Sequence, residues 1–251
     1  MEIEAFLTGL AVSPLVVFAR IGTAMIFLPG FGETYVPMRF RLLLALMVSL
    51  VMTPATPVVD LVPRGLDGLV ALLALEVVIG LWIGLMARTL IAMLHFAGYQ
   101  VGVVSNLSNA TAPDAAAFQG ATVLASALLL GGVALLFATN LHHQILVALL
   151  DSYAIFPPGQ IIPEDLALQA VKVAGASLRM GLSISAPFFV MAILANLAMG
   201  LANRMMPNLA VFFVAAPVLI AGVLLLLPIA VPEMLLGFHH LMAEWLSAFV
   251  F

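Results

Sequence analysis

The sequence predicts an all-α integral membrane protein, and three observations carry that prediction. Hydrophobic residues make up 65% of the 251 residues and charged residues only 8%, whereas soluble domains carry about 25% charge. The apolar runs are long enough for the roughly 20 residues that a membrane-spanning helix needs. One long polar segment, residues 98–120, interrupts this pattern and separates two hydrophobic blocks of similar length.

Composition and motifs exclude several classes of protein. A net charge of −4, with the charges scattered, gives no basic field for nucleic acid. The chain has no cysteine, which excludes disulfides and thiolate metal sites. The glutamates Glu2 and Glu4 stand where a secretory signal would carry basic residues, so we expect the N-terminus to be retained.

We expect no enzyme, cofactor or metal site. The sequence contains no HExxH, GxSxG or phosphate-loop motif and no two acids placed as an acid/base pair. Two pairs of adjacent histidines occur, at residues 142–143 and 239–240. Adjacent helical residues point about 100° apart, whereas chelating pairs sit at i and i+4, so these histidines are predicted to be polar helix surface.

The first apolar run, residues 5–28, predicts a helix that Pro29, Gly30 and Gly32 end. Arg20 lies inside this run, and it should face other protein, pair with an acid or snorkel. A snorkelling arginine and an intersubunit or pore contact both remain open. The second run, residues 42–51, is short and ends at a proline-rich TPATP sequence that forbids a long straight helix.

The third run, residues 69–95, is longer than one bilayer crossing and contains Glu76 and Arg88. These two residues are 12 positions apart, about 18 Å along a helix, so each must find a partner on another helix. Two GxxxG pairs, Gly80 with Gly84 and Gly98 with Gly102, permit close approach of another helix.

The polar segment 98–120 cannot face lipid, because its backbone groups would lack partners there. Pro113 and Asp114 break any regular helix within it. It therefore lies outside the bilayer or lines a cavity, and a connecting loop and a pore element both remain open.

The second hydrophobic block begins with the apolar run 121–138, a break at residues 139–143 and a helical pattern that resumes to Leu150. A turn at residues 156–159 and an acidic helix start at residues 163–165 mark the best candidate boundary.

A helix is predicted over residues 166–204, with Lys172, Arg179 and Ser183 on one narrow polar face that should meet protein. Pro187 should kink or break it unless neighbours satisfy the freed carbonyl. Arg204 begins the last tight connection, and residues 209–227 form the final apolar arm. The tail, residues 233–251, has one polar stripe and is predicted to pack on partners or lie in the interface. This makes about six apolar helices.

Several stretches resemble the FliR family of flagellar export proteins, which has counterparts in type III secretion injectisomes. The resemblance runs nearly end to end and is densest in FARIGTAMIFLPGFGETYVPMRFRLLLAL, GYQVGVVSNLSNATAPDAAAFQG, LLFATNLHHQILVALLDSYAIFPPG and NRMMPNLAVFFVAAP. It implies helical hairpins, with a FliP-like part at residues 1–160 fused to a FliQ-like hairpin at residues 161–251 that ends in the amphipathic tail.

The resemblance also implies a function. The chain would be a non-enzymatic subunit of the flagellar type III export gate in the bacterial inner membrane and flagellar basal body. Its partners would be FliP-type and FliQ-type subunits, an FlhB-type switch subunit, membrane lipid and unfolded export substrates. A small-solute or ion transporter of the inner membrane is the alternative.

Two sets of site residues follow. By the resemblance, the loop at about residues 105–120 projects into the channel as a plug, formed by Ser108, Asn109, Ala110, Thr111, Ala112, Pro113, Asp114, Phe118 and Gln119. The charges expected to lie buried between subunits are Arg20, Glu76, Arg88, Lys172, Arg179 and Arg204.

Overall fold

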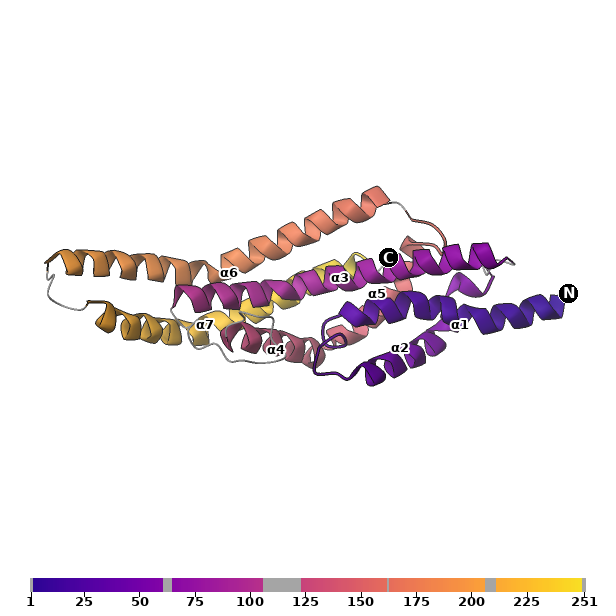
Figure 1. The fold of residues 1–251 in the computed structure, drawn as a ribbon, viewed down its shortest axis with the longest axis horizontal. Helices are drawn as coiled ribbons and strands as arrows, with labels where there is room; N and C mark the ends of the chain where they lie inside the picture. The colour runs from indigo at the N-terminus through magenta and orange to yellow at the C-terminus, as the bar shows by residue number, and fades with distance from the viewer. Residues whose placement is uncertain (1, 61–64, 106–122, 162, 206–210, 250–251) are drawn as a thin grey trace. The chain divides into compact units, whose positions relative to one another are not determined.

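The computed structural model describes residues 2–60, 65–105, 123–161, 163–205 and 211–249 (Figure 1). Side chains are described from residue 12 onward, except those of residues 59–60 and 211–216. All regular elements in these ranges are helical, as the sequence predicts. The contacts divide the chain into two units, residues 1–90, 136–174 and 242–251, and residues 91–135 and 175–241.

The first unit begins with α1 (Glu2–Phe27) and α2 (Met38–Met52), followed by two 3₁₀ helices, η1 (Thr53–Ala55) and η2 (Pro57–Asp60). It also contains the first part of α3 (Leu66–Val104), the whole of α5 (Leu141–Ile155) and the start of α6 (Pro163–Met205). The second unit contains the rest of α3, most of α4 (Val123–Ala138), most of α6 and most of α7 (Val211–Ser247).

The predicted helix ends are confirmed where prolines and glycines mark them. After α1, Gly30 has a φ of 84°, and the Gly32 amide donates a hydrogen bond to the Leu28 carbonyl at 2.7 Å. A positive φ favours glycine because other residues have a Cβ atom that clashes there. The turn after α5 has the same device at Gly159, whose φ is 80°.

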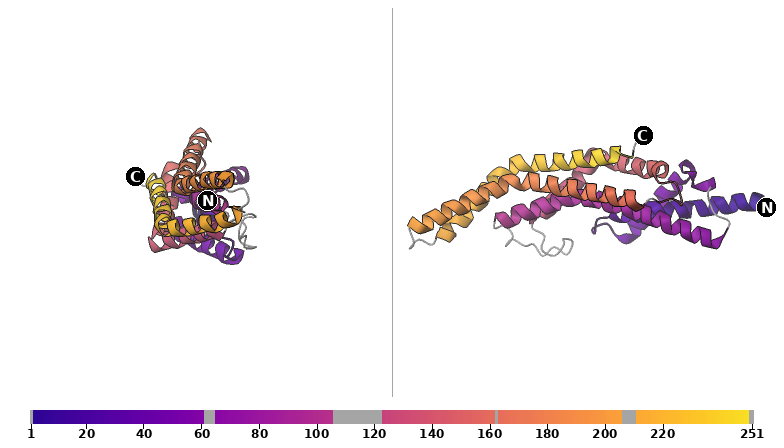
Figure 2. Two further views of the ribbon diagram at one scale, coloured as in Figure 1. Left: turned by 90° about the vertical axis from the view of Figure 1, so that its left-hand side faces the viewer. Right: turned by 90° about the horizontal axis from the view of Figure 1, so that it is seen from above.

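In the second unit, α6 and α7 form an antiparallel hairpin (Figure 2). A Cβ atom at Gly222 of α7 would meet Met191 of α6, and one at Gly237 would meet Met180. The residue numbers rise on α7 as they fall on α6, which is the pattern of an antiparallel pair. On α4, Gly131 and Gly132 lie beside side chains of α7, so α4 packs on the same helix.

The prolines of the C-terminal half do not end the helices that contain them. Pro187 lies inside α6, and Pro217, Pro228 and Pro232 lie inside α7. The prediction allowed a kink or a break at Pro187, and the helix is not broken there. Helices in apolar surroundings tolerate proline when local adjustments or neighbours satisfy the freed backbone groups.

The C-terminal tail is consequently the last part of α7 rather than a helix of its own. Its polar stripe is exposed at Glu233, His240 and Glu244. Its opposite face is buried within the chain at Met234, Phe238, Met242, Leu246 and Phe249. The tail is helical with an exposed polar stripe, as the sequence predicts, but its apolar face is buried within the chain and not on a partner or in the membrane interface.

Among the described residues, four helices are long and apolar enough to cross a membrane: Met38–Ala55, Leu66–Val104, Pro163–Met205 and Pro217–Ser247. A fifth span results if α4 and α5, which are bent by 75°, count as one crossing. The sequence predicts about six apolar helices, which is a number of helices and not of crossings, and it includes α1, a helix of 26 residues.

Candidate functional site

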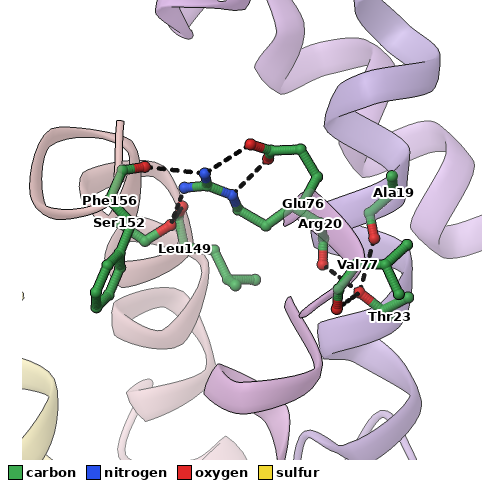
Figure 3. Close-up of polar contacts among 8 residues, drawn as sticks. All are labelled: Ala19, Arg20, Thr23, Glu76, Val77, Leu149, Ser152 and Phe156. Atoms are coloured by element: carbon green, nitrogen blue, oxygen red, sulfur yellow. Dashed lines mark hydrogen bonds and ion pairs between the residues drawn. The ribbon is translucent and has the colours of Figure 1, made fainter. Parts of the chain in front are cut away.

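The most deeply buried charges of the chain form an ion pair between α1 and α3. Arg20 of α1 and Glu76 of α3 both have side chains that are 0% exposed. The Arg20 Nε atom donates to Glu76 Oε2 at 2.7 Å, and Nη2 donates to Oε1 at 2.9 Å (Figure 3). This two-pronged geometry is the strong form of an arginine–carboxylate pair.

The remaining donors of Arg20 reach α5. Nη1 donates to Ser152 Oγ at 3.2 Å, and Nη2 also donates to the Phe156 carbonyl at 2.9 Å. The guanidinium lies 3.8 Å from the centroid of the Tyr153 ring, a cation–π contact. A buried charge is tolerated only when it is paired and hydrogen-bonded, and Arg20 meets both conditions. The arrangement joins three helices, and it contains no nucleophile next to a base.

Next to the ion pair, α1 and α3 approach closely through the first predicted GxxxG pair. A Cβ atom on Gly80 would collide with the Arg20 carbonyl and with Thr23 Oγ1. One on Gly84 would lie 2.6 Å from the Ala24 carbonyl. The second pair behaves similarly at Gly98, where a Cβ atom would lie 2.5 Å from the Cα atom of Ala125 on α4. The predicted close packing is confirmed at these three glycines.

A second ion pair holds the connector between α1 and α2. Arg88 of α3 donates to Glu33, whose side chain is 5% exposed, and Arg41 of α2 donates to the Glu33 and Val36 carbonyls at 2.8 and 2.9 Å. Partial burial and then the Glu33 carboxylate raise the pKa of the Tyr35 phenol.

The prediction that Glu76 and Arg88 each pair with another helix is confirmed for Glu76, whose partner Arg20 lies on α1. It is wrong for Arg88, whose partner Glu33 lies in the connector between α1 and α2. Arg20 neither snorkels nor needs a partner subunit to neutralise it. The other predicted intersubunit charges, Lys172, Arg179 and Arg204, are exposed on α6 and do not meet the Arg20 site. Their role between subunits stays a prediction. The predicted plug residues, Ser108 to Gln119, lie outside the described residues.

Sequence reasoning missed three parts of this site: Ser152, the Tyr153 ring and the Phe156 carbonyl. It had treated this region as a boundary only. The ion pair itself could have been found by matching, because Arg20 is the one cation in the first apolar run and Glu76 the one acid in the third.

The histidines do not form a metal cluster with acids. Among the described residues, no group of three or more histidine, cysteine, aspartate or glutamate side chains could hold a metal ion. The His142 and His143 rings instead lie against each other, with centroids 4.1 Å apart, and His142 also lies against Phe137.

Comparison with known proteins places the chain among export proteins. The family model described as Bacterial export proteins, family 1, matches residues 11–245. The flagellar biosynthetic protein FliR of Caulobacter vibrioides is 36% identical over 203 residues, which cover 80% of this chain and 81% of that protein. FliR of Escherichia coli is 29% identical over 91% of this chain and 86% of its own. FliR of Bacillus subtilis is 27% identical over 82% and 81%.

Proposed function

Because the chain belongs to family 1 of the bacterial export proteins, we propose that it is a subunit of the flagellar protein-export gate in the bacterial inner membrane. Its part there is structural: it contributes helices to the wall of a protein-conducting channel at the flagellar basal body. Relatives that match 80% and 91% of the chain are named for flagellar biosynthesis, which supports this use.

One observation carries the proposal that the chain is part of a larger assembly. Exposed large apolar side chains follow α6 from Leu168 to Met205. These residues lie 37 positions apart, about 55 Å along the helix at 1.5 Å per residue. The hydrocarbon core of a bilayer is about 30 Å thick. Lipid therefore covers only part of this apolar face, and other protein has to cover the rest.

The exposed charges of α6 support the same proposal. Lys172 and Arg179 are exposed on a helix whose neighbouring surface is apolar. Arg179 Nε reaches only the Gly175 carbonyl of its own helix, at 3.3 Å, among the described contacts. Charged groups at membrane depth are stable next to protein and not next to lipid. We propose that FliP-type and FliQ-type subunits cover them, with an FlhB-type subunit and unfolded export substrates as further partners.

Substitution by tryptophan separates a face covered by protein from one covered by lipid. The three substitutions are Leu178→Trp, Ile193→Trp and Leu201→Trp. We expect at least one of them to lower co-purification with a FliP-type subunit by about fivefold or more. A packed interface has no room for the larger ring, and overpacking costs about 1–3 kcal/mol, whereas fluid lipid accommodates it.

The measurement is the amount of FliP-type subunit recovered per tagged chain from membranes. Alanine at the same three positions is the matched control, because it removes bulk and adds none. If all three tryptophan variants recover the partner normally, or if the unsubstituted chain recovers none and transports small solutes alone, the export-gate proposal fails.

We further propose that the loop containing Ser108 and Gln119 plugs the resting channel. This rests on the family resemblance and on the composition of residues 108–119, in which small and polar residues predominate and Asp114 is the one charged residue. Deleting residues 112–117 is expected to raise ion permeability per assembled gate while export continues. A loop that merely connects α3 and α4 would instead lower the amount of assembled gate and leave permeability per gate unchanged.

A further inference from the structure

The described part of the chain between α5 and α6, residues 156–161, is flanked on both sides by contacts with side chains of other helices. At its start, the Phe156 carbonyl accepts a hydrogen bond from Arg20 Nη2 at 2.9 Å. The Phe156 ring meets the Trp82 ring edge-on, with centroids 5.8 Å apart. Beyond its end, the Leu166 carbonyl of α6 accepts a hydrogen bond from Trp82 Nε1 at 3.1 Å. We call Arg20, Trp82, Phe156 and Leu166 the clasp.

The contact between Arg20 and Phe156 provides a hydrogen-bond donor for a backbone carbonyl at the C-terminal end of α5. The Phe156 amide still donates to the Ser152 carbonyl, at 2.8 Å, but the Phe156 carbonyl lies beyond the last helical turn. Such terminal carbonyls need partners and favour a nearby cation, because the helix dipole is negative at this end. Arg20 fills this role while Glu76 holds its guanidinium in place.

The second half ties the first turns of α6 to α3. Leu166 is 8% exposed, so its side chain is already packed in the unit. The indole N–H of Trp82 gives its carbonyl a donor that does not belong to α6. A tryptophan in apolar surroundings usually finds such an acceptor, because an unpaired N–H is unfavourable there. One residue of α3 therefore contacts both ends of the connection.

Beyond Phe156, the turn of the connection takes no part in the clasp. This turn is closed by a hydrogen bond from the Gln160 amide to the Pro157 carbonyl at 3.1 Å. Pro157, Gly159 and Gln160 are exposed, whereas Pro158 is buried. The contact of Trp82 with Leu166 therefore reaches α6 without passing through the turn.

We infer that Trp82 is a positioning residue, which holds the start of α6 against α3 independently of the length of the connecting loop, and that Arg20 assists it by holding Phe156, the residue against which the Trp82 ring packs. The first turns of α6 are then attached to α3 by a specific non-covalent contact in addition to the peptide chain. This inference concerns the single chain and does not depend on the proposed function.

The test combines a longer loop with a weakened clasp. Four residues, Gly-Ser-Gly-Ser, are inserted after Gly159 in the full chain, alone and together with Trp82→Phe, which keeps an aromatic ring but removes the N–H donor. Hydrogen exchange of the backbone amides at residues 164–170 is measured on the purified chain. The insertion alone is expected to leave their exchange rates within about twofold, since the clasp is intact.

In the chain that carries both the insertion and Trp82→Phe, the same amides should exchange about three- to tenfold faster than in the chain with the insertion alone. This is the effect expected for the loss of one hydrogen bond. Trp245→Phe is the matched control, because Trp245 lies against Phe249 and takes no part in the clasp. Arg20→Lys gives a second variant that keeps the charge but loses the two-pronged pairing.

The inference is overturned if the insertion alone speeds exchange as much as Trp82→Phe does. It is also overturned if the insertion combined with Trp82→Phe or Arg20→Lys leaves exchange unchanged.

Discussion

Replacing Arg20 by methionine is expected to lower the free energy of unfolding by about 3–5 kcal/mol, because it leaves a buried carboxylate without its partner. Glu76 is 0% exposed and receives both of its side-chain hydrogen bonds from Arg20. The Phe156 carbonyl would lose its donor as well. Denaturant unfolding of the purified chain in detergent measures the change.

The double variant, Arg20→Met with Glu76→Met, separates the ion pair from packing. It removes both charges together, and a buried pair replaced by apolar groups of similar size is often as stable as the original. We expect it to be more stable than Arg20→Met alone by at least about 2 kcal/mol. Arg39→Met, at an exposed arginine of α2, should stay within about 0.5 kcal/mol of the unsubstituted chain. Equal losses in Arg20→Met and Arg39→Met would show that Glu76 does not depend on Arg20.

Substituting alanine for glycine is expected to have opposite effects at two positions. At Gly80 of α3, the new Cβ atom would collide with the Arg20 carbonyl and Thr23 Oγ1, so α1 and α3 must separate. Forced separation of a packed pair costs about 1–3 kcal/mol. At Gly200 of α6, no atom lies within 4 Å of the new Cβ, and alanine in an open helix position stabilises by about 0.5–1 kcal/mol.

Thermal or denaturant unfolding of the purified chain tests this pair of substitutions. Both variants replace a helical glycine by alanine and gain its higher helix propensity, so the difference between them reports on the contacts of the new Cβ atom. A stabilised Gly80→Ala chain would mean that α1 and α3 do not approach as closely as described.

The sequence predicted the helices well because prolines, glycines and apolar runs act locally. The end of α1 at Phe27, the break at Asn140 and the turn at Gly159 all follow from such signals. The prediction was weakest at prolines inside apolar helices, as in α7, because neighbouring groups decide whether the helix continues. The number of membrane crossings is harder to predict, because α4 and α5, which are bent by 75°, make a fifth crossing only if they count as one span.

The sequence predicted that Arg20 and Glu76 need partners, but not which partners they have. Burial cost alone required partners for Arg20 and Glu76, since a lone charge in an apolar run is unstable. The choice of partner was not predictable from spacing, because Arg20 and Glu76 are 56 residues apart. The sequence could not predict that the Phe156 carbonyl accepts a hydrogen bond from Arg20. Every residue has a carbonyl, and only the fold decides which one is left at a helix end.

The prolines of α7 give that helix a preferred direction of bending. Pro228 and Pro232 each remove one amide donor, which leaves the carbonyls of Leu224 and Pro228 without their usual partners. Residues 224, 228 and 232 are one turn apart and exposed, so the missing bonds fall along one stripe of the helix. Because the missing hydrogen bonds lie on one side of α7, the helix bends more easily in the plane of that side than perpendicular to it. It can follow a curved neighbour by small changes at these two turns, without unwinding.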